Sequence, residues 1–255
     1  MLFKGVFFDL YGTLLIPNNI RKAWKDWFNT FYKLMGNFGL IMSNKDFVNV
    51  CSGFFNKIKI EKKDNNLSIY ENKIKRFALD LNIKLKFNEI REIQQKTIYA
   101  WHKYIEIDPE TIPLLEIIKN KKSLALITNF DHPPHVYSIL AKYNLTKYFE
   151  FVAISGEIGY EKPNSKIFYV TLENVGLKPA DVVFIGDSNE DIEGALNAGI
   201  KPILIQRQNL KKRMKGNYYI SRKKVKGKKI FKNNSNLIPF KTISRLRDLY
   251  QILNL

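Results

Sequence analysis

Short apolar runs alternate along this chain with segments in which apolar residues recur at helical spacing. Each run is bounded by turn residues, which is typical of a buried strand. The runs cover residues 2–8, 123–128, 151–155, 182–186 and 202–205, with helical patterns at 137–143, 167–175 and 192–198. Strands that alternate with helices of this length predict an α/β fold with a parallel sheet covered on both faces.

Residues 17–106 interrupt the alternation of strands and helices. Apolar residues recur there at helical spacing in four groups, which begin at Trp24, Phe47, Tyr70 and Ile90. Aromatic residues at such spacing are more typical of a helical core than of a pocket lining. The sequence therefore predicts a helical insert at 17–106, with residues 1–16 and 107–255 forming the sheet domain.

Composition excludes several classes of protein. The chain has 255 residues, of which 45% are hydrophobic and 26% charged, so it is neither a disordered chain nor a disulfide scaffold. Cys51 is the single cysteine, and no apolar stretch is long enough to form a membrane helix. The first residues enter an apolar run without the pattern of a signal peptide. We expect a cytoplasmic protein.

Positive charge is concentrated in one part of the chain. The formal net charge is +18, and residues 194–247 contain sixteen Lys or Arg and no Asp or Glu. Within 207–232 these residues are interleaved with Tyr218, Tyr219 and Phe231, a composition suited to phosphate backbones and stacked bases. Two interpretations stay open: a nucleic acid or other anionic polymer as partner, or a solvated basic insertion without one.

Candidate catalytic residues follow four of the predicted strands. Asp9 ends the first run, where rigid backbone orients a carboxylate that could act as a nucleophile. Thr128 ends the second run and offers a phosphate its hydroxyl and the backbone amide of Asn129. Lys162 supplies a cation after the third run, and Asp187 ends the fourth. Asp191 lies beyond Asp187, either as part of the site or as a helix N-terminal acid.

Together these four motifs, in this order and with a helical insert after the first, resemble the haloacid dehalogenase-like hydrolase superfamily, in its helical-cap branch. The resemblance covers residues 6–206 and implies a doubly wound, Rossmann-like core with an α-helical cap at 17–106. It also implies Mg²⁺, held by Asp9, Asp187 and the carbonyl of Tyr11, since Mg²⁺ prefers oxygen ligands. Thr128 and Lys162 would stabilise the transferred phosphoryl group, and Asp191 would orient Lys162 or the metal shell.

Tyr11 departs from the phosphatase pattern. Phosphatases of this superfamily usually have an Asp two residues after the nucleophile, which protonates the leaving alcohol and then activates water. A tyrosine there resembles the dehalogenase branch and is a poor base at neutral pH. Candidate substitute acids are Tyr11 itself, Asp131 and His132, although the last two, which follow Thr128, are more typical of the start of the next helix. No zinc site is predicted, because His102, His132 and His135 lack accompanying ligands. In that respect all three histidines are interpreted as structural.

Three other positions favour a phosphatase. The metal-binding Asp187 is present, no Arg lies between Arg21 and Arg76 to receive a halide, and Phe168 stands where dehalogenases tend to have a tyrosine. The sequence therefore predicts a Mg²⁺-dependent hydrolase of small phosphate monoesters that forms an aspartyl-phosphate on Asp9. A metal-independent 2-haloacid dehalogenase, and a catalytically weakened protein that binds nucleic acid, remain the alternatives.

Overall fold

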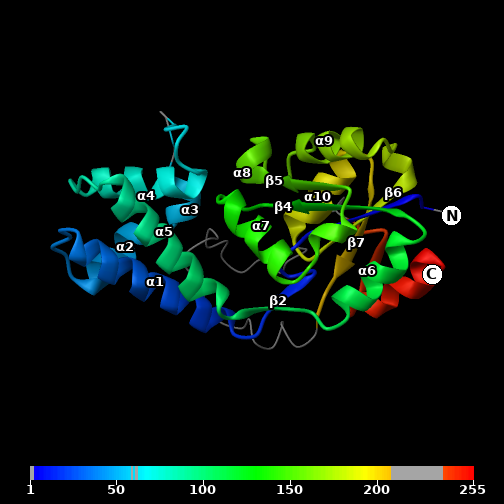
Figure 1. The fold of residues 1–255 in the computed structure, drawn as a ribbon, viewed down its shortest axis with the longest axis horizontal. Coiled ribbons are helices and arrows are strands. Elements are labelled where there is room, and N and C mark those ends of the chain that lie inside the picture. Colours follow the sequence, from blue (N-terminus) through cyan, green and yellow to red (C-terminus); the bar gives the residue numbers. More distant parts are fainter. Residues whose placement is uncertain (1–2, 59, 61–62, 208–237) are drawn as a thin grey trace. The chain divides into compact units, whose positions relative to one another are not determined.

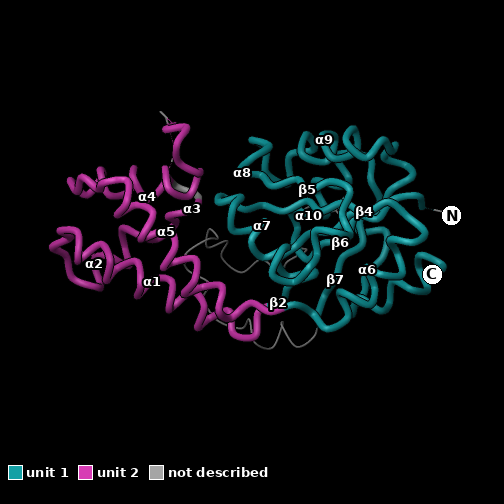
Figure 2. The backbone as a smooth tube through the Cα atoms, in the orientation of Figure 1, with its two compact units in different colours: residues 1–16, 107–212, 227–255 teal, residues 17–106, 213–226 magenta. Residues whose placement is uncertain are grey.

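A computed structural model describes residues 3–58, 60, 63–207 and 238–255. These residues form two compact units (Figure 2). Unit 1 contains residues 3–16, 107–207 and 238–255, and unit 2 contains residues from 17 to 106. The predicted basic insertion at 207–232 lies outside the described residues except for Arg207.

Unit 1 is built on a six-stranded sheet in the order β5-β4-β1-β6-β7-β8 (Figure 1). The strands are β1 (Gly5–Phe8), β4 (Ser123–Thr128), β5 (Phe151–Ile154), β6 (Val182–Gly186), β7 (Lys201–Ile205) and β8 (Lys241–Ile243). Every neighbouring pair is parallel. The chain builds the sheet outward from β1 first through β4 and β5, then through β6, β7 and β8, which is the doubly wound arrangement. The predicted fold class is confirmed.

Helices cover the sheet because alternate strand residues are apolar on both faces. Phe7, Ala125 and Phe184 share a buried cluster with residues of two helices, α9 and α10. The next residues along the same strands, such as Phe8 and Leu126, are equally buried and point to the opposite face. The principal helices of unit 1 are α6 (Thr111–Lys119), α7 (Pro133–Lys142), α9 (Lys166–Val175) and α10 (Asn189–Asn197).

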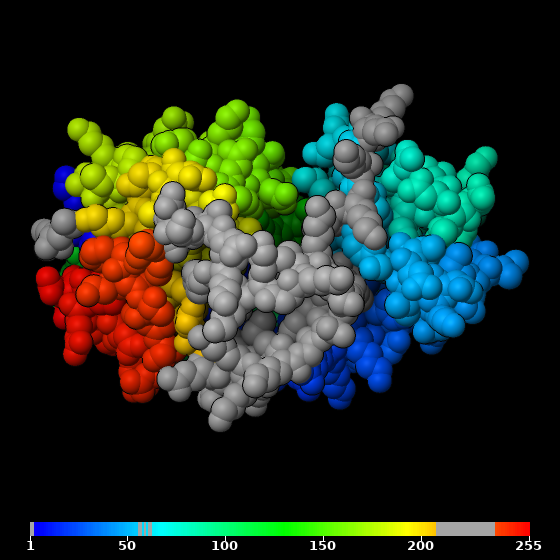
Figure 3. Space-filling view, turned by 180° about the vertical axis from the view of Figure 1, so that it is seen from behind, coloured from blue at the N-terminus to red at the C-terminus, as the bar shows by residue number. Residues whose placement is uncertain are grey.

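Short elements complete unit 1. They are α8 (Ser155–Ile158), α12 (Leu249–Leu253) and the 3-10 turns η1 (Thr146–Tyr148), η2 (Pro179–Asp181) and η3 (Leu246–Asp248). The sequence did not predict β8, which has only three residues and follows the undescribed segment. It pairs with β7, and Figure 3 shows the C-terminal residues on the surface of unit 1 beside the segment that contains β7.

Two further short strands were not predicted from the sequence. The strands β2 (Leu15–Pro17) and β3 (Ile105–Ile107) pair with each other where the chain leaves unit 1 and where it returns. Each has three residues, too few to show an alternating pattern. The two segments in which the chain passes from one unit to the other therefore lie side by side.

Unit 2 is helical, as the apolar spacing predicted. Its helices are α1 (Ile20–Asn37), α2 (Asn44–Cys51), α3 (Phe54–Lys57), α4 (Ile69–Asp80) and α5 (Phe87–His102). The pattern that begins at Phe47 does not form one helix, because Gly53 adopts a left-handed φ of 82° between α2 and α3.

Aromatic side chains form the core of unit 2, as predicted. Trp27, Phe31 and Phe54 are at most 2% exposed, and Trp27 Nε1 donates a hydrogen bond to Tyr70 Oη at 2.9 Å. Among the described residues of the whole chain, no helix combines the length and the apolar character needed to cross a lipid bilayer.

Candidate active site

The predicted site residues gather where the parallel strands end. Asp9 follows β1, Thr128 ends β4, and Asp187 follows β6, while Lys162 lies in the loop after α8. In a doubly wound sheet, ligands bind at the carboxyl ends of the strands where the strand order reverses. Here that point lies around β1, whose neighbours are β4 and β6. The backbone N–H of Asp9 donates to Ile185 O at 2.8 Å, which fixes the residue as an extension of β1.

A buried ion pair joins Asp9 to Lys162. Lys162 Nζ lies 2.7 Å from Asp9 Oδ1, and the two side chains are only 3% and 7% exposed. Burial raises the pKa of Asp9 to about 6, since the Lys162 cation lowers it by less and Asp191 raises it further. The second oxygen, Asp9 Oδ2, is buried and has no hydrogen-bond partner among the described residues. One oxygen of the Asp9 carboxylate is therefore bound by Lys162, and the other is available to a ligand.

Lys162 is fixed from three sides. Its ammonium group also donates to Ile127 O at 2.9 Å and pairs with Asp191 Oδ1 at 2.6 Å. Burial alone would lower the pKa of Lys162, but the two carboxylates outweigh burial and raise it, so the lysine is a permanent cation. The backbone of Lys162 exchanges two hydrogen bonds with the side chain of Asn129, at 2.8 and 2.9 Å.

Asp191 serves two partners at once. Its Oδ2 accepts hydrogen bonds from the backbone N–H groups of Asp187 and Ser188 and from the Ser188 hydroxyl, which closes a capping box at the start of α10. Its Oδ1 faces Lys162. The sequence left Asp191 as either a helix N-terminal acid or a member of the site; the structure places it in the capping box of α10 and in contact with Lys162.

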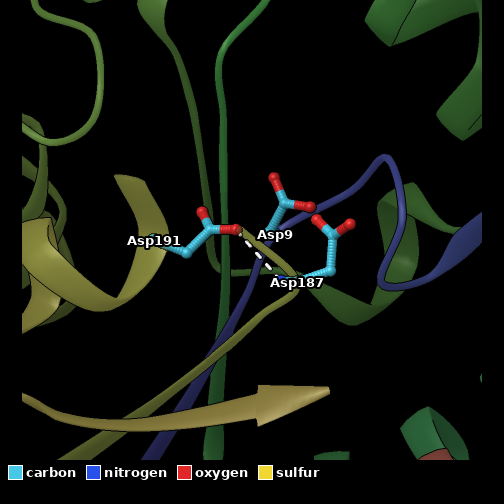
Figure 4. A group of neighbouring side chains, drawn as sticks. All are labelled: Asp9, Asp187 and Asp191. Atoms are coloured by element: carbon cyan, nitrogen blue, oxygen red, sulfur yellow. Dashed lines mark hydrogen bonds between the residues drawn. The ribbon is translucent and has the colours of Figure 1, made fainter. Parts of the chain in front are cut away.

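Three carboxylates could hold a metal ion. One carboxylate oxygen from each of Asp9, Asp187 and Asp191 lies within 4.8 Å of the other two (Figure 4). Asp191 is committed to its capping bonds, whereas Asp187 is exposed and Asp9 Oδ2 lacks a hydrogen-bond partner within the described chain. A buried carboxylate oxygen without a donor, beside a second carboxylate, fits a hard divalent cation such as Mg²⁺. Asp9 and Asp187 are therefore the residues present that fit the predicted metal.

Gly12 shapes the loop beside this carboxylate pair. Its φ of 101° lies in the left-handed region, and a Cβ at this position would come within 2.3 Å of Asp187 Oδ2. The absence of a side chain at Gly12 thus lets the loop after β1 lie directly against the Asp187 carboxylate. The carbonyl of Tyr11, predicted as a third metal ligand, belongs to the same loop.

Tyr11 occupies the position of the expected acid–base residue. Its ring stacks on Phe130 with the ring centroids 5.3 Å apart, and Phe130 in turn stacks on His135 at 5.4 Å. Burial, with smaller contributions from Asp9 and Tyr143, raises the pKa of Tyr11 far above its usual value. The phenol is thus neutral and cannot serve as a base at physiological pH.

The structure brings most of the predicted residues into one network, but not all by direct contact. Asp9, Lys162, Asp191 and Asn129 are linked by hydrogen bonds or ion pairs, and Asp187 joins them through its backbone. Thr128 is buried at the end of β4. Asp131 and His132 are half-buried just before α7.

Sequence reasoning missed Ser155 and Arg207. The Ser155 hydroxyl accepts from Phe130 N at 3.0 Å, next to Asn129, and Arg207 binds the loop after Asp9. Serine at a strand end is too common to be a signal, and Arg207 was counted only as part of the basic stretch.

Comparison with known proteins gives one family. The family model for haloacid dehalogenase-like hydrolases matches residues 3–199. N-acylneuraminate-9-phosphatase of Rattus norvegicus is 30% identical over 116 residues, which are 44% of this chain and 46% of that protein. The chain therefore spans less than half the length of this curated relative.

Solved structures agree on the fold and differ in activity. A HAD phosphatase from Thermococcus onnurineus superposes with a TM-score of 0.63 at 23% identity, over 98% of this chain and 97% of the other. A 2-haloacid dehalogenase from Pseudomonas syringae pv. Tomato also gives 0.63, at 18% identity and over 99% of each chain. At these identities the superpositions establish the fold alone.

Proposed function

Because the chain belongs to the haloacid dehalogenase-like hydrolase family, we propose that it hydrolyses small phosphate monoesters with the help of Mg²⁺ and through an aspartyl-phosphate on Asp9. The observation that carries the proposal is the carboxylate of Asp9. It is buried, held by Lys162 on one oxygen and without a partner among the described residues on the other, and it lies beside Asp187. The curated relatives include N-acylneuraminate-9-phosphatase, which supports the same reaction class.

The chain's own residues suit an in-line displacement. A carboxylate oxygen of Asp9 attacks phosphorus, the bond from phosphorus to the ester oxygen breaks, and the departing oxygen takes its proton from solvent water. Lys162 keeps Asp9 oriented and provides positive charge as negative charge spreads over the phosphoryl oxygens. The Thr128 hydroxyl and the backbone N–H of Asn129, at the same strand end, would bind those oxygens. Water then attacks phosphorus, breaks its bond to Asp9 and releases phosphate.

Asp9, Asp187 and the Tyr11 carbonyl would hold Mg²⁺. When bound, the cation would offset the repulsion between the anionic ester and the carboxylates and act as a Lewis acid. Asp191 acts at a distance from the ester. It keeps Lys162 in place through Oδ1, and its capping bonds to Asp187 and Ser188 fix the loop that carries Asp187.

Tyr11 limits the choice of leaving group in this proposal. Burial raises the pKa of the Tyr11 phenol, so it is a weak acid toward a departing alkoxide, and in its neutral form it is not a base toward water. Loss of general acid–base assistance slows a step by about 10²–10⁴-fold. We therefore propose an enzyme with slow turnover that favours esters of good leaving groups. Unit 2 would serve as the substrate-selecting cap, and the reducing cytoplasm, where Cys51 stays a thiol, would be its location.

The second candidate is a metal-independent 2-haloacid dehalogenase, which Tyr11 favours, because a halide leaves without protonation. Asp187 and the metal-compatible carboxylate pair that it forms with Asp9 favour the phosphatase instead.

One experiment separates the two reactions. Wild type and Asp9→Asn are assayed on para-nitrophenyl phosphate, with Mg²⁺ and with chelator, and chloride release from 2-chloropropionate is measured in parallel. Nitrophenolate needs little protonation, so the assay does not depend on Tyr11. Hydrolysis that requires both Mg²⁺ and Asp9 supports the phosphatase. Chloride release in chelator without phosphate release overturns it in favour of the dehalogenase, and absence of both reactions overturns both.

A further inference from the structure

Arg207 follows β7 and is bound inside unit 1. Its Nη2 donates to Thr13 O at 2.6 Å, and its Nη1 pairs with Asp108 Oδ2 at 2.5 Å. The side chains of Arg207 and Asp108 are only 12% and 5% exposed. Although Arg207 is the first residue of the basic stretch 207–232, its positive charge is paired with the Asp108 carboxylate inside unit 1.

The partner of Arg207 is itself tied to the same loop. The backbone N–H of Asp108 donates to Leu14 O at 3.0 Å, and the Thr111 hydroxyl donates to that carbonyl at 2.9 Å. Asp108 Oδ1 accepts from Glu110 N at 2.7 Å, which orients the carboxylate toward Arg207. Two successive carbonyls of the loop, those of Thr13 and Leu14, are thus held by one network.

That loop connects the nucleophile to the proposed metal ligands. Leu10 O accepts hydrogen bonds from Leu14 N at 3.0 Å and Leu15 N at 2.8 Å, and Gly12 N donates to Leu15 O at 2.7 Å. The turn therefore closes immediately after Asp9. Its apex contains Tyr11 and Gly12, and Gly12 lies against the Asp187 carboxylate. A shift at Thr13 would be transmitted through this closed turn to Gly12.

A guanidinium suits this position better than other cations. Its planar fork can bind a carbonyl and a carboxylate at once with fixed geometry, whereas an ammonium group acts as a single point charge. Burying an ion pair is costly in desolvation, so a pair at this place adds little to stability compared with apolar packing. The main effect of the Arg207–Asp108 pair is therefore to fix the geometry of the loop, rather than to stabilise the fold.

We propose that Arg207 is a positioning residue: with Asp108 it holds the Thr13 carbonyl and thereby keeps the loop with Tyr11 and Gly12 against Asp187. The proposal rests on the proposed function for its effect on turnover, but its effect on the loop and on Mg²⁺ binding does not depend on any substrate. Substrate would not contact Arg207, so its loss should lower kcat and Mg²⁺ affinity more than it changes the KM for substrate.

The test uses full-length Arg207→Met, Arg207→Lys and Asp108→Asn, with Arg247→Met as the matched control. Arg247 also forms an ion pair in unit 1, with Glu110, but its side chain is 58% exposed. Three properties are measured: hydrogen exchange in the peptide that covers residues 10–15, Mg²⁺ affinity by calorimetry, and kcat and KM for para-nitrophenyl phosphate.

We expect faster exchange at residues 10–15 in Arg207→Met, about tenfold weaker Mg²⁺ binding and about 10²-fold lower kcat, with KM changed little. Arg207→Lys should recover part of each loss, and Arg247→Met should match wild type. Should Arg207→Met fail to fold, Arg207→Lys and Asp108→Asn carry the same comparison.

Wild-type exchange and Mg²⁺ affinity in folded Arg207 and Asp108 variants would overturn the proposal. A wild-type protein that does not hydrolyse para-nitrophenyl phosphate would contradict the proposed function instead, and exchange and Mg²⁺ binding would still decide the role of Arg207. If the wild type also bound no Mg²⁺, unchanged exchange in the variants would overturn the positioning role and faster exchange would support it.

Discussion

Lys162 and Asp9 form an ion pair with 2.7 Å between Nζ and Oδ1, although 153 residues separate them in the chain. The positive charge of the lysine stabilises the ionised form of the buried Asp9 carboxylate. Because Asp191 holds the same lysine from its other side, two carboxylates share one buried positive charge. This sharing governs how the site should respond to substitution.

Replacing Asp9 with Asn should abolish hydrolysis while leaving the protein at least as stable. The raised pKa of Asp9 means that the folded state binds its proton more tightly than the unfolded state. Between about pH 4 and 6, stability from this group is therefore lost as pH rises, and the ionised form destabilises the metal-free protein by about 1–3 kcal/mol at pH 7.

Thermal unfolding in chelator checks this sign. Asp9→Asn should gain more in melting temperature at pH 7.5 than at pH 4.5, when each is compared with wild type. Substantial hydrolysis by this variant would contradict the assignment of the nucleophile, and a loss of stability confined to pH 7.5 would contradict the cost of its charge.

Replacing Lys162 with Met should destabilise the protein and reduce turnover. It leaves Asp9 and Asp191 buried without their shared cation, and breaking such a buried pair costs about 3–5 kcal/mol. Denaturant unfolding and kcat for para-nitrophenyl phosphate measure the two effects. Lys166→Met is the matched control, because Lys166 is exposed and its ammonium group contacts the hydroxyl and ring of Tyr160. Equal behaviour of the two variants would argue against a role for Lys162.

Replacing Tyr11 with Asp should supply the missing general acid and base. We expect kcat for alkyl phosphates to rise by about 10²-fold, and kcat for para-nitrophenyl phosphate to rise less, because nitrophenolate leaves without protonation. Tyr11→Phe keeps the ring that stacks on Phe130 and serves as the control. A fall in activity with both substrates in Tyr11→Asp, but not in Tyr11→Phe, would show that the aromatic ring matters more than the base.

Replacing Gly12 with Ala should weaken Mg²⁺ binding. The new Cβ would lie within 2.3 Å of Asp187 Oδ2, so that carboxylate or the loop must move. Gly176→Ala is the matched control: its φ of 71° imposes similar backbone strain, but within the described residues no atom outside its own stretch of chain lies within 4 Å of the added Cβ. We expect both variants to lose stability by about 1 kcal/mol or more, and only Gly12→Ala to lose about tenfold or more in Mg²⁺ affinity by calorimetry. Equal affinities would contradict the contact with Asp187.

The sequence by itself determined the α/β class, the helical character of residues 17–106 and the positions of the principal buried strands. These follow from local periodicity, which each segment carries whatever its neighbours are. It also singled out Asp9 and Asp187, because charged residues directly after buried strands stand out against the apolar pattern, and Lys162, because it follows the third strand in the order of the four motifs. The short strands β2, β3 and β8 carry no such pattern, since three residues cannot display a period.

Only the tertiary structure decided which of these groups meet and with what consequence. Asp191 divides its oxygens between a helix cap and Lys162. Arg207 binds Thr13 and Asp108 rather than contributing to an exposed basic surface. Both arrangements depend on contacts across much of the chain. The pKa changes of Asp9 and Tyr11 likewise arise from burial, which no local pattern reports. Periodicity is a property of neighbouring residues, whereas charge pairing and desolvation are properties of the packed fold.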